Sequence, residues 1–426
     1  MVWKEDLLHF IWRYRRYQPF ALKTVDGEEV KVLDAGQYNS DAGPDFLYAK
    51  VMIGTTEWIG HVEIHVQADD WYLHQHDSDL AYNNVILHVV WENHVHCRRE
   101  DHSLVPTLIL KNYVDEKILV QYTYLMKSSH QIPCAPHLAA VNELVKTNWL
   151  QRMSIERLES KFQNYIAGQK NIDWEKLTFK LLCRSFGMQV NKETFMKLGE
   201  LVDIKLLQKY RADDTKINAI LFGQAGFLED EFQDEYYQNL KSTYLYLKSA
   251  HHFPQLYAHE WKFLRMRPYN FPTYRLAQLG SLYTHYSTLF STLIALQTIE
   301  EVHKLFAIAS IDPFWQTHYL FARTTSKHPT NWAKGIIDHL LINCFAVVVF
   351  NYGKYMQNSE YMDKSMRWIA SLMAEKNKIT SHFQPYGLTA QNASDSQAMV
   401  HLFNEYCEKR KCLACAIGSA ILKRSN

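Results

Sequence analysis

The chain has 426 residues, of which 47% are hydrophobic and 21% are charged, and its formal net charge is +1. This length exceeds what one hydrophobic core usually supports, so we expect two domains, and the composition excludes a disordered chain. The near-zero net charge excludes a global attraction to nucleic acid, so any such binding has to come from a local basic patch.

The first predicted elements are a helix and a strand. Residues 1–17 carry apolar side chains at helical spacing, and residues 30–34 are typical of a strand. The N-terminal segment Met1–Asp6 lacks the apolar stretch and the cleavage site of a signal peptide. The loop 36–43, with its glycines and Asn39, predicts a turn before the next strand.

Residues 43–65 are the most informative stretch, because they predict a β-hairpin with acidic residues near both open ends. If its turn centres near Thr55, Asp45 lies opposite His65, and directly opposed side chains share a face. Glu63 shares that face with His65, because side chains alternate along a strand. The hairpin is therefore expected to gather Asp45, Glu63 and His65 at one place.

Three further segments complete the N-terminal part. Residues 69–83 are polar and partly helical, 85–91 form an apolar run typical of a central strand, and 104–110 predict one more strand. Two prolines in the segment 130–136 interrupt any regular element. We therefore place a domain boundary there, with one domain at 1–130 and a second at 131–426.

The second domain is expected to be all-α, since long helical patterns dominate it and no comparable strand pattern is present. The longest apolar run of the chain, 339–350, is shorter than the roughly 20 residues that span a bilayer, and it predicts a buried helix. We therefore expect a cytoplasmic protein without a membrane segment. The predicted helices are 141–163, 174–186, 192–209, 231–249, 273–296, 332–351 and 361–376.

Pro44-Asp45, followed by Glu63-Ile64-His65 on the next strand, resembles the motif of the PD-(D/E)XK nuclease core. The order of helix, strands, helix and strand over residues 1–110 agrees with that core. The resemblance implies a restriction-endonuclease-like α/β domain, a mixed sheet with flanking helices. One departure concerns catalysis, because His65 stands where such nucleases usually have lysine.

The whole chain also resembles an uncharacterised bacterial family, a domain of unknown function, and this resemblance is the closer of the two. It implies no activity. The stretches that carry it are Asn39-x-Asp41-Ala42-Gly43-Pro44-Asp45-Phe46, Leu221-Phe222-Gly223-Gln224-Ala225-Gly226, Arg265-Met266-Arg267-Pro268-Tyr269-Asn270-Phe271-Pro272-Thr273 and the C-terminal cysteine cluster.

The nuclease resemblance implies a magnesium (or manganese) site. Mg²⁺ prefers one or two carboxylates together with water and substrate phosphate oxygens. Asp45 and Glu63 would be its ligands, with the backbone carbonyl of Ile64 as the third group. Glu5 on the first helix would be an accessory ligand, and His65 would orient or deprotonate the attacking water.

The histidine-rich segment after the hairpin allows other interpretations. His74, His76 or Asp77 could contact the scissile phosphate or the leaving group. A rival hypothesis is a zinc site, since imidazole nitrogens suit zinc, although no spacing matches a known zinc hydrolase signature. A third interpretation is that these are ordinary surface and core-edge side chains, as His88 within an apolar strand would be. The zinc candidates are His61, His65, His74, His76, His88 and Asp77, whereas His94, His96 and His102 have no recognisable spacing.

The C-terminal cysteines Cys407, Cys412 and Cys415 form a second constellation. A cytosolic chain keeps its thiols reduced, so clustered cysteines indicate a metal before a disulfide. Tetrahedral Zn²⁺ or a [4Fe–4S] cluster would need a fourth ligand, for which Cys134 is the first candidate, then His401 or Cys344. Three reduced cysteines on a terminal helix remain an equal alternative.

Four arginines are candidate nucleic-acid contacts, although most charge runs are only solvated faces. Arg98 and Arg99 follow the central strand, whereas Arg265 and Arg267 precede a stretch with several aromatic residues. Lys409, Arg410 and Lys411, between the cysteines, also suit such a contact.

Three functions remain as hypotheses. The first is Mg²⁺-dependent hydrolysis of phosphodiesters in nucleic acid, DNA before RNA, at Asp45, Glu63 and His65. The second is a non-catalytic nucleic-acid-binding or assembly protein on a degenerate nuclease scaffold. The third is a zinc-dependent hydrolase that uses the histidine cluster.

Overall fold

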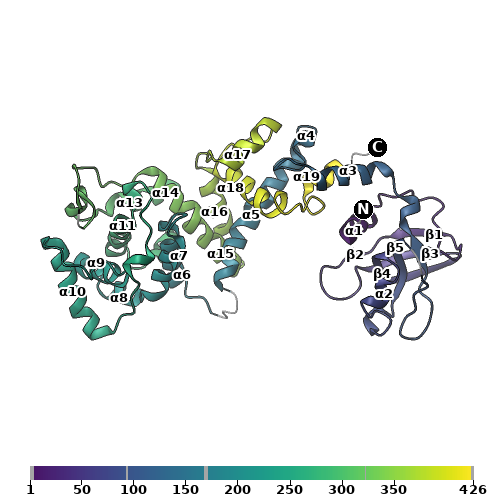
Figure 1. The fold of residues 1–426 in the computed structure, drawn as a ribbon, viewed down its shortest axis with the longest axis horizontal. Coiled ribbons are helices and arrows are strands. Elements are labelled where there is room, and N and C mark those ends of the chain that lie inside the picture. The colour runs from purple at the N-terminus through teal and green to yellow at the C-terminus, as the bar shows by residue number, and fades with distance from the viewer. Residues whose placement is uncertain (1–3, 93–94, 167–170, 322, 424–426) are drawn as a thin grey trace. The chain divides into compact units, whose positions relative to one another are not determined.

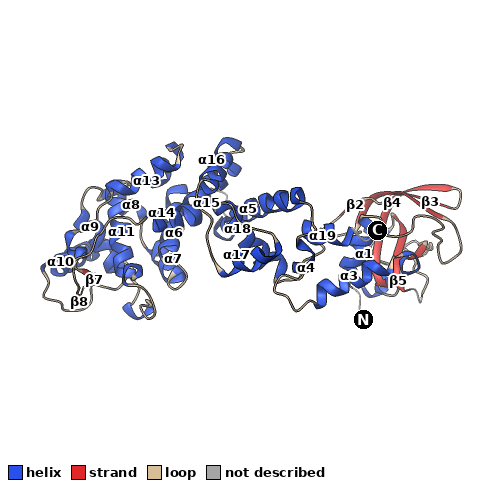
Figure 2. Cartoon of the chain, turned by 90° about the horizontal axis from the view of Figure 1, so that it is seen from above, coloured by secondary structure: helices blue, strands red, loops and turns tan. Residues whose placement is uncertain are grey.

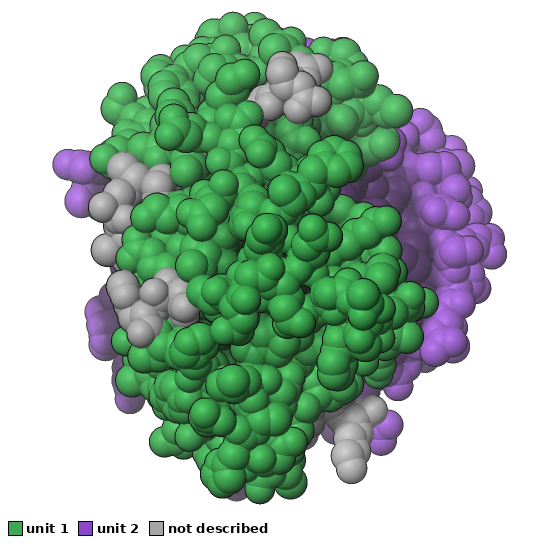
Figure 3. All heavy atoms as spheres, turned by 90° about the vertical axis from the view of Figure 1, so that its right-hand side faces the viewer, with its two compact units in different colours: residues 1–149, 381–388, 402–426 green, residues 150–380, 389–401 purple. Residues whose placement is uncertain are grey.

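The computed structural model describes residues 4–92, 95–166, 171–321 and 323–423. His94 and the first three residues of the N-terminal segment considered above lie outside the described residues. The chain divides into two compact units (Figures 1 and 3). Unit 1 comprises Met1–Trp149, Ser381–Leu388 and Leu402–Asn426, and unit 2 comprises Leu150–Thr380 and Thr389–His401. The expected boundary near residue 130 lies before this division, and the C-terminal residues that we expected in the helical domain belong to unit 1.

Unit 1 is built on a mixed sheet, whose strands are coloured red in Figure 2. The strand order is β1-β3-β4-β5-β6, and β2 also pairs with β3. The pairs β1–β3, β2–β3 and β3–β4 are antiparallel, whereas β4–β5 and β5–β6 are parallel. The strands are β1 (Val30–Asp34), β2 (Gln37–Tyr38), β3 (Phe46–Ile53), β4 (Thr56–Gln67), β5 (Val85–Glu92) and β6 (Thr107–Ile109).

Strand β5 is the central, fully covered strand that its apolar sequence predicts, since seven of its eight residues are buried. Next to it, β4 passes close enough that only glycine fits at Gly60. A Cβ atom there would lie 2.4 Å from Cγ2 of Ile86 and 2.6 Å from the carbonyl oxygen of Asn84. This close approach sets the β4–β5 pairing beside the acidic residues.

Two helices of unit 1, α1 and α2, pack against strand β4 of this sheet. One face of α1 buries Leu7, Leu8 and Ile11, while Glu5 and Asp6 in its first turn and Arg13 in its last turn complement the helix dipole. The helices are α1 (Glu5–Arg13), α2 (Asp70–Leu73), α3 (Glu116–Lys127), α4 (Ala135–Leu138), α19 (Ala416–Lys423) and the start of α5 (Glu143–Ile166).

Unit 2 is helical, and its described residues contain one short strand pair, β7 (His318–Leu320) with β8 (Arg323–Thr324), which the sequence patterns did not predict. A π-helical turn, Leu341–Phe345, interrupts the long helix formed by α14 and α15. Most of α5 belongs to this unit, and α17 (Lys378–Phe383) is divided between the two units. The other helices are α6 (Trp174–Phe186), α7 (Lys192–Leu201), α8 (Ile204–Lys209), α9 (Asp214–Gln224), α10 (Glu235–His251), α11 (Pro272–His285), α12 (Leu289–Ala295), α13 (Ile299–Ile308), α14 (Lys334–Leu340), α15 (Ala346–Tyr355), α16 (Ser359–Ala370) and α18 (Ala393–Leu402).

The long helix Lys334–Tyr355 is the one described helix that is long and apolar enough to cross a membrane. Most of its apolar stretch, 72%, is buried inside the protein, and its side chains belong to the large core of unit 2. It is therefore the buried helix that the apolar run predicts. The coarse fold prediction, an α/β part followed by a helical part, is confirmed.

Candidate functional site

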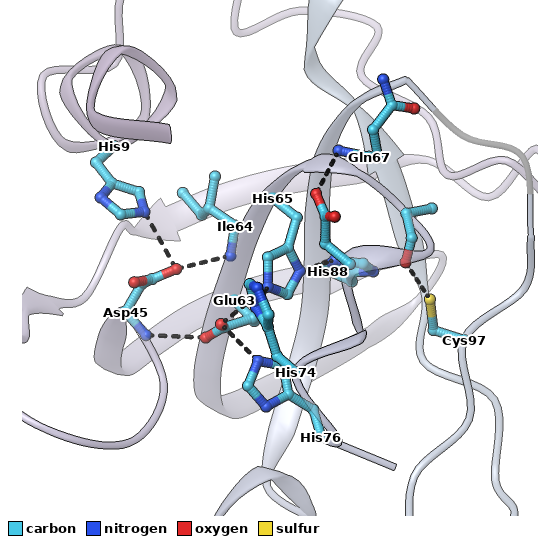
Figure 4. Close-up of polar contacts among 12 residues, drawn as sticks. His9, Asp45, Glu63, Ile64, His65, Gln67, His74, His76, His88 and Cys97 are labelled. Atoms are coloured by element: carbon cyan, nitrogen blue, oxygen red, sulfur yellow. Dashed lines mark hydrogen bonds and ion pairs between the residues drawn. The ribbon is translucent and has the colours of Figure 1, made fainter. Parts of the chain in front are cut away.

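The β3–β4 hairpin brings Asp45 and Glu63 together, but not in the predicted register (Figure 4). Ile53 pairs with Thr56 and Ala49 with Gly60, whereas Phe46 pairs with Val62, because a bulge shifts the register between Phe46 and Ala49.

Continued one residue further, this register places Asp45 opposite Glu63. The prediction that Asp45 lies opposite His65 is therefore wrong. A hairpin without the bulge would put Ile64 opposite Asp45, so the bulge is what places both carboxylates on one face. Tyr48 in the bulge has a φ of 57°, an uncommon conformation for a side chain of its size.

Backbone amides orient the two carboxyl groups. The N–H of Asp45 donates to Oε2 of Glu63 at 3.1 Å, and the N–H of Ile64 donates to Oδ2 of Asp45 at 2.9 Å. Each acid is thus held by the backbone next to the other. Ile64 lies between Glu63 and His65 on β4, and a metal contact of its carbonyl stays a prediction.

The loop before Asp45 is fixed by Asn39. Its Nδ2 donates to the carbonyl oxygens of Ala42 and Pro44 at 3.2 and 3.1 Å, and its Oδ1 accepts from the N–H of Asp41 at 3.0 Å. The N–H of Asn39 in turn donates to the carbonyl of Asp45 at 2.8 Å. This part of the sequence motif therefore holds Asp45 at the start of β3.

His65 lies at the centre of a histidine cluster and is almost fully buried. Its Nδ1 lies 2.9 Å from Nε2 of His88, and its Nε2 lies 3.2 Å from Nδ1 of His74 and 3.5 Å from Oε1 of Glu63. His76 stacks on the His65 ring and approaches the same Glu63 oxygen at 3.3 Å. Ring nitrogens of His65, His74 and His76 lie within 4.8 Å of one another, so these three residues could hold a metal ion.

The other zinc candidates lie less centrally. His61 accepts a hydrogen bond from the N–H of Tyr48 at 3.3 Å, away from this cluster. His88 is fully buried and is partnered by His65, as expected of a core histidine. Asp77 is half-buried and its charge acts on His76.

Glu63 and His65 have strongly shifted pKa values. Burial, and next the charge of Asp45, raises the pKa of Glu63 to about 8. Burial, and next the neighbouring His76 and His74, lowers the pKa of His65 to about 3. At neutral pH Glu63 therefore carries a proton, and His65 is neutral.

His9 is a site residue that the sequence analysis missed. It lies on α1, and its Nε2 is 3.2 Å from Oδ2 of Asp45. Burial lowers the pKa of His9, but the hydrogen bond to Asp45 and its charge outweigh burial, so the net pKa is raised. The sequence feature that could have identified His9 is its spacing from Glu5, which lies one helical turn earlier on the same face of the helix. Burial raises the pKa of Glu5, and the charge of Asp45 adds to this effect, so Glu5 lies near the acids.

A cavity of about 400 Å³ in unit 1, here called the basic groove, adjoins this site through His9. It runs between α1, Tyr38 and the C-terminal loop, and among its charged side chains only Asp6 is acidic. Lys409, Arg410 and Lys411 of the C-terminal loop form one wall of the groove. The cations that line the groove are Lys4, Arg13, Lys409, Arg410 and Lys411.

Cys134, Cys407, Cys412 and Cys415 are all buried, and none forms a disulfide. Burial raises the pKa of the Cys407 thiol, and Cys134, Cys415 and Cys412 add to the effect. The four thiols therefore lie near enough in unit 1 for their charges to act on one another, although Cys134 is far away in sequence. Burial also raises the pKa of Cys415, to about 11. The N–H groups of Gly418 and Ile417 donate to its sulfur and act in the opposite direction, lowering the pKa.

The two other candidates for a fourth ligand belong to unit 2 and are engaged there. Nε2 of His401 lies 3.3 Å from Oε1 of Glu156, and Sγ of Cys344 donates to the carbonyl of Thr178 at 3.8 Å.

The four predicted nucleic-acid arginines are dispersed. The Arg99 guanidinium donates to the carbonyl oxygens of Val85 and Leu104, and Arg98 donates to that of His102, so both fix their own loop. Arg265 and Arg267 belong to unit 2, where Arg267 donates to the Tyr269 hydroxyl at 2.8 Å. Their contact with nucleic acid stays a prediction.

A comparison with family models matches residues 5–378 to one family, described as "Protein of unknown function (DUF2851)". No curated protein matches the chain, and no solved structure does.

Proposed function

The chain belongs to the DUF2851 family, and from the geometry of its site we propose that it is a metal-dependent phosphodiesterase acting on nucleic acid. The observation that carries the proposal is the pair Asp45 and Glu63, which the bulged hairpin holds side by side. Glu63 is buried and protonated at neutral pH, and it can exchange this proton for a divalent cation that Asp45 also binds. Such an exchange removes the charge repulsion that raises the pKa of Glu63.

The strand arrangement supports a restriction-endonuclease-like core. The acids lie on an antiparallel hairpin, and the following strands β5 and β6 run parallel to β4. With α1 packed on β4, this is the order of elements that the PD-(D/E)XK resemblance implies.

The donor set fits Mg²⁺ or Mn²⁺. Asp45 and Glu63 would hold the ion, with the carbonyl of Ile64 as a third group, and Glu5 and His9 lie near Asp45. When bound, the ion would neutralise charge on the phosphate and acidify water. We infer that His65 orients its neighbours, because a pKa of about 3 makes it too weak a base at neutral pH.

His9 is the better proton-transfer group. It contacts Asp45, it lines the basic groove, and its pKa is raised, so it carries a proton more readily than a free histidine. In this role the imidazolium would donate its Nε2 proton to the leaving oxygen. His74 is exposed next to His65 and is available to orient the attacking water.

The basic groove would bind the nucleic-acid backbone. Its cations suit phosphates, and Tyr14 and Tyr38 line the same cavity, where they could stack on bases of a single strand. We propose DNA before RNA as the substrate, and a cytoplasmic location in keeping with the free cysteines. If Asp45 and Glu63 bind no metal, the same groove supports the alternative of a non-catalytic nucleic-acid-binding protein.

A zinc-dependent hydrolase is the second candidate, and one observation favours it. Three ring nitrogens, from His65, His74 and His76, already lie within 4.8 Å of one another, and two of these rings contact Glu63. Three histidines and one further ligand position are typical of catalytic zinc.

We also propose that the four cysteines bind a metal, Zn²⁺ or a [4Fe–4S] cluster. Lys409, Arg410 and Lys411 lie between Cys407 and Cys412, so this centre would fix one wall of the basic groove. Arg410 already anchors the loop by donating to the carbonyl oxygens of Leu125 and Ser128. Backbone N–H groups that donate to Cys415 favour its thiolate, as a metal ligand requires.

The deciding experiment is cleavage of a supercoiled plasmid by the purified full-length chain with Mg²⁺, Mn²⁺ or Zn²⁺. Asp45→Asn and Glu63→Gln should each reduce cleavage at least about 100-fold, since each removes a ligand charge with little change in shape. Glu57→Gln is the matched control, because Glu57 lies on the same strand but is exposed. Cleavage that survives both site variants would refute the proposal. Activity with Zn²⁺ alone would favour the second candidate.

A further inference from the structure

Unit 2 contains a cavity of about 510 Å³ that the proposed nuclease site does not use. It lies between the start of α11 and the segment that follows β8. Its volume is within the range of pockets for nucleotide-sized molecules. The lining residues on which the following argument rests are Tyr269, Asn270, Tyr274, Arg275, Gln278, Tyr319 and His328.

Arg275 lines this cavity as a buried cation, only 4% exposed. Its Nη1 donates to Oε1 of Gln278 at 2.5 Å and its Nη2 to Oδ1 of Asn270 at 2.6 Å. Both partners are neutral amides, and Nε has no hydrogen-bond partner. Among the described residues, no carboxylate pairs with this guanidinium.

An unpaired buried charge is costly, and proteins usually retain one only where a partner arrives. Burial accordingly lowers the pKa of Arg275 to about 10, which still leaves it charged at neutral pH. The two amides hold the guanidinium in a fixed orientation and leave its charge available. Arg275 lies in the first turn of α11, which contains no acidic residue, and the helix dipole there also favours an anion.

Aromatic rings form another wall of the cavity. The rings of Tyr319 and His328 stack with centroids 4.0 Å apart at an angle of 6°, and Tyr274 lies 5.2 Å from Tyr319. The Thr273 hydroxyl donates to the carbonyl of Tyr319 at 2.5 Å and fixes this wall to α11. Flat rings next to an unpaired guanidinium suit a ligand that is both planar and anionic.

We propose that this cavity binds a nucleoside phosphate, with the phosphate on Arg275 and the base against Tyr319. Arginine presents several donors to phosphate oxygens, and the hydroxyl groups of Tyr269, Tyr274 and Tyr319 add donors at the same cavity. The ligand is either a free mononucleotide or the phosphorylated end of a nucleic-acid strand. This binding is independent of Asp45 and Glu63, which belong to unit 1.

The test is calorimetric titration of the full-length chain with adenosine 5′-monophosphate, adenosine, inorganic phosphate and a short oligonucleotide with and without a 5′-phosphate. We expect the monophosphate to bind at least tenfold more tightly than adenosine and to raise the melting temperature. If only the phosphorylated oligonucleotide binds, and through Arg275, the source is a strand end and the proposal stands. Equal binding of adenosine and its monophosphate, or no binding of any phosphate compound, overturns it.

Two variants locate the site. Arg275→Met should weaken binding of the monophosphate at least tenfold, whereas Arg211→Met, on an exposed arginine of unit 2 outside the cavity, should leave it unchanged. Because Arg275→Met also removes two internal hydrogen bonds, Tyr319→Ala provides a second test in a protein that keeps the cation. That variant should weaken the monophosphate about fivefold and leave inorganic phosphate unaffected. Wild-type affinity in both Arg275→Met and Tyr319→Ala would refute the assignment.

Discussion

The substitution Glu63→Gln should stabilise the metal-free protein at neutral pH. The folded chain raises the pKa of Glu63 from 4.5 to about 8. A carboxyl group with a raised folded-state pKa contributes its full stability below pH 4.5, where it is protonated in both states. That contribution is lost as the pH rises toward 8, because the unfolded chain releases the proton first.

The size of the effect follows from the shift. Each pH unit between 4.5 and 8 lowers the free energy of unfolding by about 1.4 kcal/mol. Ionisation of Glu63 in the unfolded chain therefore destabilises the folded wild type by about 3 kcal/mol at pH 7. Glutamine keeps the acceptor for the N–H of Asp45 but cannot ionise. The stability difference between Glu63→Gln and wild type should therefore widen by about 3.5 kcal/mol from pH 5 to pH 8.

Hydrogen–deuterium exchange of peptides from β4, measured without divalent cations, reports the opening free energy of this strand. Comparing variants at the same pH removes the pH dependence of intrinsic exchange. Glu57→Gln, on an exposed position of the same strand, should match the wild type at every pH. A difference that stays constant between pH 5 and 8 would refute the raised pKa of Glu63.

Divalent cations provide the second half of the test. Mg²⁺ or Mn²⁺ should stabilise β4 in the wild type but not in Glu63→Gln, because binding requires the Glu63 carboxylate. Calorimetry in two buffers of different ionisation enthalpy should show close to one proton released for each ion bound at pH 7. Binding without proton release would mean that the ion occupies another site.

Further predictions concern the neighbouring residues. Burial lowers the folded-state pKa of His65 to about 3, so the stability that neutral His65 contributes is complete above pH 6.5. This contribution falls as the pH falls, by about 2 kcal/mol at pH 5. In the same exchange assay, the opening free energy of β4 in His65→Gln should therefore depend less on acid than that of the wild type. His65→Lys should retain Mg²⁺-dependent cleavage if the site works as a nuclease, whereas loss of bound zinc, measured by elemental analysis, would support the zinc hypothesis. Cys134→Ser should lower the content of zinc or iron in the purified protein at least twofold, and Cys97→Ser, a buried cysteine apart from the cluster, should not change it. Lys409→Ala with Lys411→Ala should weaken DNA binding and reduce its salt dependence by about two counterions, and unchanged salt dependence would exclude the groove as the binding surface.

The sequence indicated the members of the candidate site better than their geometry. Asp45, Glu63 and the histidines could be found because strand patterns and acidic residues are local signals. The bulge near Tyr48 could not, because nothing in the sequence around it requires an extra residue there. The predicted opposition of Asp45 and His65 failed for two reasons. The turn between Ile53 and Thr56 lies half a residue earlier than expected, which shifts the register by one residue, and the bulge shifts it by another. Both acids still reach one face.

Contacts between residues that are far apart in the sequence were also difficult to predict. The suggestion of Cys134 as a partner of the C-terminal cysteines rested on residue type. The charges of Cys415 and Cys412 do act on its thiol, and a shared metal site stays a prediction. His9 and Arg275 gave weaker signals, since a histidine or an arginine on an apolar helix face is usually structural. His9 differs from an ordinary core residue in its contact with Asp45. Arg275 differs in that no carboxylate among the described residues pairs with it.

Unit 1 is interrupted in sequence by unit 2, and this has a consequence for biosynthesis. A ribosome delivers β1 to β6 early, but Lys409 and Cys412 emerge only after all of unit 2 has been made. The basic groove beside the N-terminal sheet therefore cannot be completed until these residues have been synthesised. Contacts between segments so far apart in the sequence also form slowly. In a newly made chain, the acidic site at Asp45 and Glu63 would lack the neighbouring cations Lys409 and Lys411 until those residues have been synthesised.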